Sequence, residues 1–415
     1  MNMILPVSPR TVLIIGAGQA GGQAARQLLA EGFDGRIVVA GAEMHPPYER
    51  PPLSKAVLKD AAAESAIAIV SPEEWRDPRI DFRAGDPVVS LDAEGAQARL
   101  QSGAAVGFDV CLIATGGDAR ILPIPGAEFC RNLRTLDDSR ALRAELTPGR
   151  RLVIIGGGVI GCEVAATAAT LGCKVTIVEA GQRLMARILP PVVSDWLAEW
   201  HARAGVDIVT GARLHAIEQA SGALVVTGEN PDGTALRLDS DLVLSAIGMA
   251  PNAELVADER RGPTGGILTD ACGRVIGSDR LFALGDVAES WSPLYGRHLR
   301  LETWRNADKQ ARAIARTLCG TETPHAETPW MWTDQLDRNI QVVGLWSEGA
   351  EVICRGPVGE PGSAVFWLQD GMLCGGALID AGRDRRFLEK LVETAATPSA
   401  ADLANPSLPL KNLAR

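Results

Sequence analysis

The sequence predicts an α/β protein in which two nucleotide-binding domains, each built on a parallel sheet, are accompanied by a C-terminal α/β domain. The chain has 415 residues, too many for one ordinary core and suitable for two or three domains. A pattern of apolar strand, glycine-rich turn and helix occurs twice, with first glycines at Gly16 and Gly156. The end of the chain contains strands followed by a helix, which indicates a third domain.

The two glycine-rich turns share the spacing G-x-G-x-x-G. The first lies in Val12–Gly21, VLIIGAGQAG, and the second in Leu152–Gly161, LVIIGGGVIG. In a Rossmann-like unit the first two glycines allow a tight turn and close approach of a pyrophosphate, and the third lets the helix pack against the strand. Because both copies lie between a strand and a helix, we expect two dinucleotide sites rather than plain turns. The motif glycines are Gly16, Gly18, Gly21, Gly156, Gly158 and Gly161.

The end of the second strand in each repeat indicates which nucleotide binds. Glu179 ends that strand in the second repeat, where a carboxylate holds a ribose 2′-hydroxyl and would repel a 2′-phosphate. This site should therefore prefer NADH to NADPH. In the first repeat Gly41 takes the equivalent position, and the nearest acid is Glu43. Glu43 either reaches the ribose of the first nucleotide or is an exposed loop acid.

The segment Glu49–Lys55, ERPPLSK, places a charged side chain just after a rigid backbone. Pro51 and Pro52 restrict the backbone torsions of this segment. Lys55 is then either aimed at a ligand or a solvated loop residue, which is the usual environment of lysine.

Three further apolar strands end in small residues or in an acid. The segments 108–117, FDVCLIATGG, and 242–252, LVLSAIGMAPN, resemble junctions where the chain crosses between nucleotide domains. The segment 280–289, RLFALGDVAE, ends its strand in Gly-Asp. Ligands bind at the carboxyl ends of strands in open α/β sheets, so Asp286 is a candidate ligand residue. The alternative role for Asp286 is a helix N-cap.

The C-terminal domain is expected to contain strands in 340–346, 351–356 and 364–379 and a helix in 383–396. Before them, TPWMWTDQ places Trp330 and Trp332 at alternate positions, on one face of an extended segment. These two residues are either core aromatics or part of a site. The tail from Pro398 has little periodicity, so we expect it to lie loosely on the surface.

A cationic cluster precedes this domain. The segment 306–320, NADKQARAIARTLCG, places Lys309, Arg312 and Arg316 on one helix face, and Arg305 comes just before it. Such a face is either simply solvated or a docking patch for an acidic partner.

Composition and cysteine spacing exclude several classes. The net charge of −10 disfavours binding to nucleic acid or to an acidic membrane, and no apolar run is long enough to span a bilayer. The N-terminus lacks the basic region of a signal peptide. None of the eight cysteines forms C-x-x-C, so neither a zinc cluster nor a redox dithiol is indicated. We expect free thiols in a cytoplasmic protein that has no metal.

In combination, these blocks resemble the FAD-dependent, NADH-using ferredoxin reductases of bacterial oxygenase systems. The resemblance covers nearly the whole chain. It implies an FAD-binding domain of residues 10–114 and 249–323, an NAD-binding domain of residues 115–248 and a C-terminal domain of residues 324–415. The blocks that carry it are GAGQAG, YERPPLSK, ATGG, NLRTLDD, GGGVIGCEVAA, SAIGMAPN, ALGDVAE, RLETWRNADKQA and PWMWTDQ.

The resemblance also implies roles for single residues. Lys55 and Glu163 would form a catalytic pair, in which the ammonium stabilises negative charge on reduced flavin while Glu163 holds the lysine and contacts the nicotinamide. The expected cofactor-binding residues besides the motif glycines are Ala20, Glu43, Arg50, Lys55, Val88, Thr115, Gly116, Arg134, Val159, Ile160, Glu163, Glu179, Gly248, Asp286, Glu302, Trp304 and Trp332.

Two positions depart from the family pattern. Members usually carry an acid where this chain has Ala42, which puts the standard ribose contact in doubt. Many have tyrosine where this chain has Val159, and valine cannot stack over a flavin. We therefore expect easier access to the flavin and more leakage of electrons to oxygen.

The resemblance predicts that hydride passes from NADH to FAD and that single electrons pass to an acidic [2Fe–2S] ferredoxin serving an oxygenase. The ferredoxin would dock near Arg305, Lys309, Arg312, Arg316 and Trp330. Glutathione, thioredoxin and CoA-disulfide reductases and NADH peroxidases are excluded because their cysteines are missing. A rubredoxin reductase, an NADH oxidase and a non-catalytic NADH-sensing flavoprotein remain as alternatives.

Overall fold

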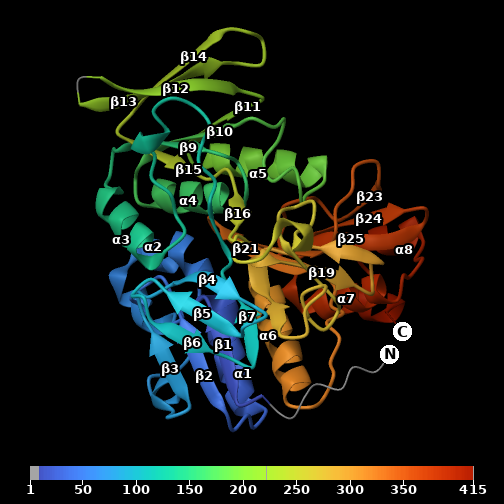
Figure 1. Ribbon diagram of the computed structural model, residues 1–415. Helices are drawn as coiled ribbons and strands as arrows, with labels where there is room; N and C mark the ends of the chain where they lie inside the picture. Colours follow the sequence, from blue (N-terminus) through green and yellow to red (C-terminus); the bar gives the residue numbers. More distant parts are fainter. Residues whose placement is uncertain (1–8, 221, 415) are drawn as a thin grey trace. The chain divides into compact units, whose positions relative to one another are not determined.

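A computed structural model describes residues 9–220 and 222–414 (Figure 1). The chain forms two compact units. The first contains the residues up to 50 together with 65–118 and 250–327, and the second contains 51–64, 119–249 and 328–415. The chain passes from the first unit to residues 119–249 of the second unit within β8 (Gly117–Ala119), and it returns within β16 (Met249–Pro251).

The first unit is built on a five-stranded sheet in the order β18-β7-β1-β2-β3, in which all neighbouring strands are parallel. Its central strand, TVLII, is almost wholly buried, as expected for a parallel strand covered on both faces. Val12 and Ile14 pack toward the helices α1 and α6, while Leu13 and Ile15 pack on the opposite face against Val88 and its neighbours. The elements are β1 (Thr11–Ile15), β2 (Arg36–Ala40), β3 (Ile80–Arg83), β7 (Val110–Ile113), β18 (Leu281–Ala283), α1 (Gln19–Ala30) and α6 (Trp304–Leu318).

Two small sheets complete the first unit. One is the antiparallel sheet β4-β5-β6, and the other has the order β17-β19-β20. Their strands are β4 (Val88–Asp92), β5 (Gln97–Leu100), β6 (Ala105–Gly107), β17 (Ile267–Thr269), β19 (Ala288–Ser292) and β20 (Arg297–Leu299).

The second unit repeats the strand–turn–helix pattern around a parallel four-stranded sheet in the order β11-β10-β9-β15. An antiparallel sheet, β12-β13-β14, extends beyond it (Figure 1). The elements are α2 (Ala56–Lys59), α3 (Leu136–Glu145), β9 (Arg151–Ile155), α4 (Val159–Thr170), β10 (Lys174–Glu179), α5 (Pro191–Arg203), β11 (Val206–Thr210), β12 (Arg213–Ala220), β13 (Ala223–Glu229), β14 (Ala235–Ser240) and β15 (Leu242–Ser245).

The C-terminal part of the second unit is an antiparallel five-stranded sheet in the order β21-β22-β25-β24-β23. It shares one hydrophobic core with the parallel sheet β11-β10-β9-β15. In this core, Val193 and Leu197 of α5 join Ile340, Val365 and Trp367. The elements are β21 (Trp330–Gln335), β22 (Arg338–Gly344), β23 (Glu351–Arg355), β24 (Ala364–Gln369), β25 (Met372–Ile379), α7 (Arg385–Glu393), α8 (Ala400–Ala404) and α9 (Leu410–Leu413).

The prediction of a loose C-terminal tail is wrong. Leu403 and Leu410 are buried in the core formed by the C-terminal sheet and α7. The buried guanidinium of Arg355 donates to the backbone oxygens of Leu403 at 2.6 Å, Asp402 at 3.0 Å and Leu408 at 3.1 Å. The tail helices have four and five residues, which is too short to show a helical period in the sequence.

The α/β fold class predicted from the sequence is confirmed: both glycine-rich turns lie between a parallel strand and a helix. None of the helices in the described part of the chain is long and apolar enough to span a bilayer.

Candidate functional site

The first glycine-rich turn joins β1 to α1. Gly16 has a φ of +108°, and a Cβ there would lie 2.3 Å from the backbone oxygen of Ala114. A Cβ on Gly21 would lie 1.9 Å from the oxygen of Gly16, so neither position accepts a side chain. Gly18 differs, because the nearest atom to a Cβ there is the Arg50 guanidinium at 3.6 Å. Space is therefore open above Gly18, in front of the first turn of α1.

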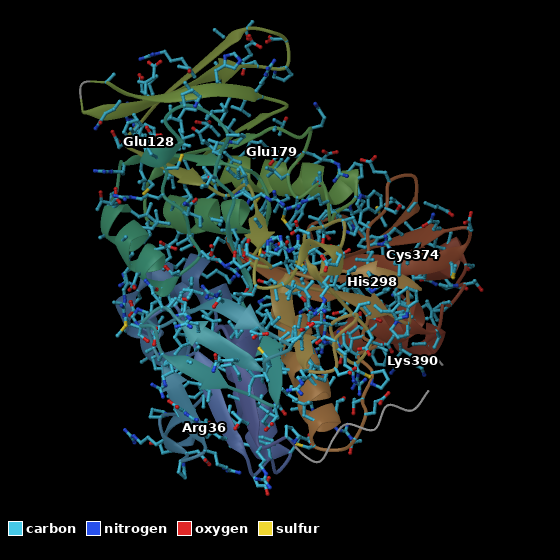
Figure 2. The ribbon with its side chains drawn as sticks, in the orientation of Figure 1. Arg36, Glu128, Glu179, His298, Cys374 and Lys390 are labelled. Carbon is cyan, nitrogen blue, oxygen red and sulfur yellow. The ribbon has the colours of Figure 1, made fainter. Side chains whose placement is uncertain are left out.

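The second turn has almost the same geometry. Gly156 has a φ of +109°, and Cβ atoms on Gly156 and Gly161 would lie 2.5 Å and 2.0 Å from backbone oxygens. A Cβ on Gly158 would meet nothing within 4 Å. Glu179 ends β10 beside this turn (Figure 2), and its two carboxylate oxygens accept from the N–H groups of Gly157 and Gly181, each at 2.6 Å.

Both turns fit a dinucleotide. Neither α1 nor α4 has a side-chain hydrogen bond at its N-cap glycine, so their first-turn N–H groups remain available to an anion. The open space over Gly18 and over Gly158 is where a pyrophosphate can approach the backbone.

Glu43 lies beside the first glycine-rich turn and is fixed by hydrogen bonds from neighbouring side chains. Its carboxylate accepts from Tyr48 Oη at 2.5 Å and from Arg50 Nη2 at 2.8 Å. Arg50 is also the side chain nearest to the space above Gly18. Glu43 is thus anchored beside the open space rather than extended into solvent. Ala42, the departure noted above, precedes it.

The Gly-Asp turn after β18 lies at the same end of the first unit. Gly285 has a φ of +75°, and a Cβ there would lie 2.8 Å from Cβ of Ala20 in α1. The N–H of Gly285 donates to the buried Gln310 of α6 at 2.8 Å, which fixes the turn. Arg300 donates to the backbone oxygen of Asp286 at 3.3 Å. Asp286 is therefore held close to the N-terminal end of α1.

Glu302 and Trp304 lie at the start of α6. Glu302 accepts from Arg300 at 2.6 Å, and Trp304 begins the helix behind an N-cap at Thr303. Burial raises the pKa of Glu49, which directly precedes Arg50.

The Ala-Thr-Gly junction after β7 is also fixed by hydrogen bonds. Thr115 Oγ1 donates to the backbone oxygen of Asn252 at 2.6 Å, and the N–H of Asn252 donates to the oxygen of Gly116 at 3.0 Å. Val88 has its side chain in the hydrophobic core, so only its backbone is free to meet a ligand.

Lys55 and Glu163 meet within the second unit. Lys55 Nζ lies 2.8 Å from Oε2 of Glu163, whose side chain is only 2% exposed on α4. The same oxygen accepts from Ser54, and Thr167 of α4 donates to the backbone oxygen of Ser54 at 2.8 Å. The Pro51–Ser54 turn is thereby attached to α4, and it delivers Lys55 to Glu163. This confirms the pairing that the resemblance implied, while its catalytic role remains a prediction.

Comparison with known proteins places this geometry in a family. Residues 10–311 match the pyridine nucleotide-disulphide oxidoreductase family, and residues 330–414 match the reductase C-terminal family. The chain therefore belongs to the pyridine nucleotide-disulphide oxidoreductase family, and its C-terminal part matches the reductase C-terminal family. It is 37% identical over 406 residues to the anthranilate 1,2-dioxygenase system ferredoxin–NAD(+) reductase component of Burkholderia cepacia, with 96% of this chain and 98% of that protein covered. Putidaredoxin reductase of Pseudomonas putida is 36% identical, with 97% and 96% covered.

Solved structures of similar proteins support the same family assignment. The ferredoxin reductase for the CYP199A2 system of Rhodopseudomonas palustris superposes with a TM-score of 0.91 at 34% identity, covering 98% of this chain and all of that one. The reductase in the covalent putidaredoxin reductase–putidaredoxin complex gives 0.90 at 33% identity, covering 97% and 98%. The enzyme is therefore an oxidoreductase, and its family implies FAD and NADH as cofactors.

Other expected residues of this family member lie in the second unit. Val159 and Ile160 begin α4, where Ile160 is 41% exposed. Gly248 has a φ of +97° just after β15, and Arg134 directly precedes the N-cap of α3. Trp332 stacks on Trp330 with ring centroids 5.2 Å apart, and the Arg385 guanidinium lies over Trp330 at 4.8 Å.

The expected cofactor residues are divided between the two units. Those in the first unit are Gly16, Gly18, Ala20, Gly21, Glu43, Arg50, Val88, Thr115, Gly116, Asp286, Glu302 and Trp304. Those in the second unit are Lys55, Arg134, Gly156, Gly158, Val159, Ile160, Gly161, Glu163, Glu179, Gly248 and Trp332.

The cationic cluster on α6 is partly neutralised. Arg305 and Lys309 both pair with Glu327, at 3.0 Å and 3.2 Å. Arg312 is exposed and Arg316 half-buried farther along the helix, so any excess positive charge on this face is concentrated there.

Sequence reasoning missed the polar residues that surround Glu163. Thr333 Oγ1 donates to Glu163 Oε1 at 2.7 Å, and neither Thr333 nor Ser54 was expected at the site. The alternation of Thr333 and Gln335 in β21 shows that they share one face of the strand, but it gives no indication of which polar partner lies there.

Proposed function

We propose that this chain is an NADH-dependent ferredoxin reductase that supplies electrons to an oxygenase through a [2Fe–2S] ferredoxin. The relatives with this printed activity match almost the entire chain and are themselves matched over almost their entire length. The observation that carries the proposal is the ion pair between the half-buried Lys55 and the buried Glu163, which lies on the helix that follows the second glycine-rich turn.

In this proposal the first unit holds FAD. The first-turn N–H groups of α1 would hold the pyrophosphate, Arg50 would add a positive charge, and Asp286 would offer a carboxylate to the hydroxyl groups of the cofactor. When bound, the flavin accepts hydride from the nicotinamide and releases electrons one at a time. FAD binding is assigned to residues 10–114 and 249–323, NAD binding to 115–248, and the C-terminal domain starts at residue 324.

The second turn binds NADH in the same way. The start of α4 contacts the pyrophosphate and Glu179 contacts the adenosine ribose, which favours NADH over NADPH. Glu163 holds the side chain of Lys55 in place. A fixed positive charge at this position stabilises the negative charge that develops on the acceptor ring during hydride transfer.

Replacing Lys55 with methionine tests the proposal. Lys55→Met should slow reduction of the bound flavin by NADH about 100-fold, because one oriented charge is lost. Anaerobic stopped-flow absorbance measures this rate. Lys59→Met is the matched control, since Lys59 ends the adjacent short helix and is exposed. An unchanged rate in Lys55→Met would remove this lysine from the site.

The electron acceptor separates the remaining alternatives. Rapid turnover with a [2Fe–2S] ferredoxin, together with slow turnover with oxygen alone, is expected of a reductase. Fast turnover with oxygen alone would indicate an NADH oxidase. Absence of turnover with either acceptor, despite a reducible flavin, would indicate a sensor.

The acidic ferredoxin is proposed to dock on the exposed basic part of α6. Glu327 pairs with Arg305 and Lys309, Asp308 offsets part of the charge of Arg312, and the remaining positive charge of this face lies on Arg312 and Arg316. Arg312→Glu should raise the KM for ferredoxin, weaken its dependence on ionic strength and leave reduction of the flavin by NADH unchanged. An unchanged KM would place the docking surface elsewhere.

A further inference from the structure

A buried hydrogen-bond chain extends from the far side of Glu163. The two oxygens of this carboxylate serve different segments: Oε2 accepts from Lys55 and Ser54, and Oε1 accepts from Thr333 Oγ1 at 2.7 Å. Thr333 belongs to β21 of the C-terminal sheet and is fully buried. The carboxylate that holds Lys55 is therefore itself held by a different part of the fold.

The chain continues through two more buried side chains. Gln335 lies two residues along β21, on the same face as Thr333, and its amide nitrogen donates to Thr333 Oγ1 at 3.1 Å. Its amide oxygen lies 2.8 Å from Nε2 of His201, in the last turn of α5. Thr333, Gln335 and His201 each have an exposed fraction of 0%. Strand β21 thus connects α5 to α4 through side chains alone.

The direction of every hydrogen bond in this chain follows from Glu163. An ionised carboxylate only accepts, so the single hydroxyl hydrogen of Thr333 is directed to it. Thr333 Oγ1 must then accept from Gln335, which turns the amide nitrogen toward Thr333 and the amide oxygen toward His201. The second amide hydrogen points to the sulfur of Met185 at 3.4 Å. His201 must therefore carry its hydrogen on Nε2.

If every hydrogen bond in this chain had the opposite direction, the other nitrogen of His201 would make the chain less stable. Burial lowers the pKa of His201, so the ring is neutral. Nδ1 has no hydrogen-bond partner among the described residues, which suits a nitrogen without a hydrogen. In the reversed chain Nδ1 would carry the hydrogen, and it would be a buried donor without an acceptor. The histidine thus favours the direction in which all donors point toward Glu163, and aligned bonds reinforce one another.

We propose that Thr333, Gln335 and His201 are positioning residues, which hold Glu163 in one orientation through Oε1 so that its other oxygen, Oε2, aims Lys55. The inference rests on the proposed function, because only that function gives the Lys55–Glu163 pair a role in flavin reduction. It assigns β21 of the C-terminal sheet a part in the reaction with NADH.

The principal test is Thr333→Val, which replaces a hydroxyl with a methyl group of similar size. Reduction of the flavin by NADH should slow about 10-fold, which corresponds to about 1.4 kcal/mol. The midpoint potential of the bound flavin should become more negative, as in Lys55→Met, because a misaligned ammonium stabilises the reduced ring less. Thr333→Ser retains the donor and should restore the rate to within about twofold and the potential to that of the parent enzyme.

Thr328→Val is the matched control. Thr328 is also buried in the second unit, and its hydroxyl also donates to a carboxylate, that of Glu393 at 3.2 Å. Both valine variants should melt at similarly reduced temperatures, whereas only Thr333→Val should slow the reaction and shift the potential. Gln335→Met provides a second variant of the chain and should slow flavin reduction about threefold.

A double-mutant cycle shows whether Thr333 acts through Glu163. In a Glu163→Gln background, Thr333→Val should cause no further loss of rate. A Thr333→Val enzyme with the parent rate and potential, or a loss that persists in the Glu163→Gln background, would overturn the inference while the proposed function stands. If Lys55→Met and Glu163→Gln themselves have the parent rate, the proposed role of the pair falls and the inference falls with it.

Discussion

The two glycine-rich turns have almost the same backbone, and they differ in the side chains that surround it. In both, the first glycine has a φ near +108° and lies against a backbone oxygen, and the middle glycine faces open space. In the second turn, Glu179 is fixed by two backbone N–H groups. In the first, Glu43 comes from a loop and is fixed by Tyr48 and Arg50.

The comparison separates binding of a nucleotide, which depends on the backbone, from selectivity between nucleotides, which depends on side chains. The backbone of each turn provides a general site for a pyrophosphate, since it uses only N–H groups and the absence of Cβ atoms. Selectivity between nucleotides depends on side chains that can change without altering the turn. The second repeat has an acid at the strand end, whereas the first has a carboxylate–guanidinium pair contributed by the following loop.

The largest expected effect comes from filling the open space in one turn at a time. Gly18→Ala and Gly158→Ala add a Cβ that meets no atom within 3.5 Å, so the fold should be retained. The added methyl group occupies the space where a pyrophosphate approaches. Gly18→Ala should lose FAD during purification, whereas Gly158→Ala should keep FAD and bind NADH about 100-fold more weakly.

Flavin absorbance and titration with NADH measure these two losses separately. Thermal unfolding of each variant, measured without added nucleotide, is the control for the fold. If Gly158→Ala lost the flavin and Gly18→Ala did not, the assignment of the two turns would be reversed.

A smaller effect is expected at the ends of the second strands. Glu179→Gln removes the negative charge but keeps an amide oxygen for one of the two backbone N–H groups. The preference for NADH over NADPH should fall about 10-fold, because a 2′-phosphate is no longer repelled. The ratio of kcat/KM for the two nucleotides measures the change.

Glu43→Gln in the first repeat is the control for this effect. It should leave the nucleotide preference unchanged, because Glu43 belongs to the turn assigned to FAD. An equal loss of preference in both variants would show that general charge, rather than contact with the ribose, selects NADH.

Sequence reasoning succeeded where the cause of the structure is local. The glycines of both turns are required by contacts within a single strand–turn–helix unit, so their spacing predicts them. The pair of Lys55 and Glu163 lies 108 residues apart in the chain and came only from the resemblance to a family. Their pairing depends on the attachment of the Pro51–Ser54 turn to α4, which no local pattern reveals.

The hydrogen-bond chain of Thr333, Gln335 and His201 behind Glu163 could not have been predicted. His201 and Gln335 are separated by 134 residues, and both are ordinary polar residues in otherwise regular elements. Only the folded chain shows that they are buried and aligned. The C-terminal tail was misjudged for the opposite reason: its helices are short, and they are held by Arg355, a charged residue expected at the surface.

The smallest expected effect concerns an aspartate that precedes β7 in the first repeat and β15 in the second, the strands that pair with β1 and β9. Asp109 accepts from the N–H groups of Arg10 and Thr11, each at 2.8 Å. Asp241 accepts from the N–H of Arg151 at 2.9 Å and also from its guanidinium at 2.6 Å. The hydrogen bond from the Arg151 side chain, aided by the backbone N–H, lowers the pKa of Asp241 to about 2. Of these two aspartates, Asp241 alone accepts from a guanidinium among the hydrogen bonds of the described residues.

Because folding lowers this pKa, the stabilisation is complete above the ordinary value near 4 and is lost as the pH falls toward about 2. The pair is partly exposed, so solvent screening limits the effect. Asp241→Asn should reduce the free energy of unfolding by about 0.5 kcal/mol at pH 7, and the difference from the parent should shrink by pH 3. Urea titrations at both pH values measure it, with Asp239→Asn as the exposed control. A deficit that is equally large at pH 3 would mean that the backbone contact, which Asp109 also makes, provides the whole effect and that the guanidinium adds nothing.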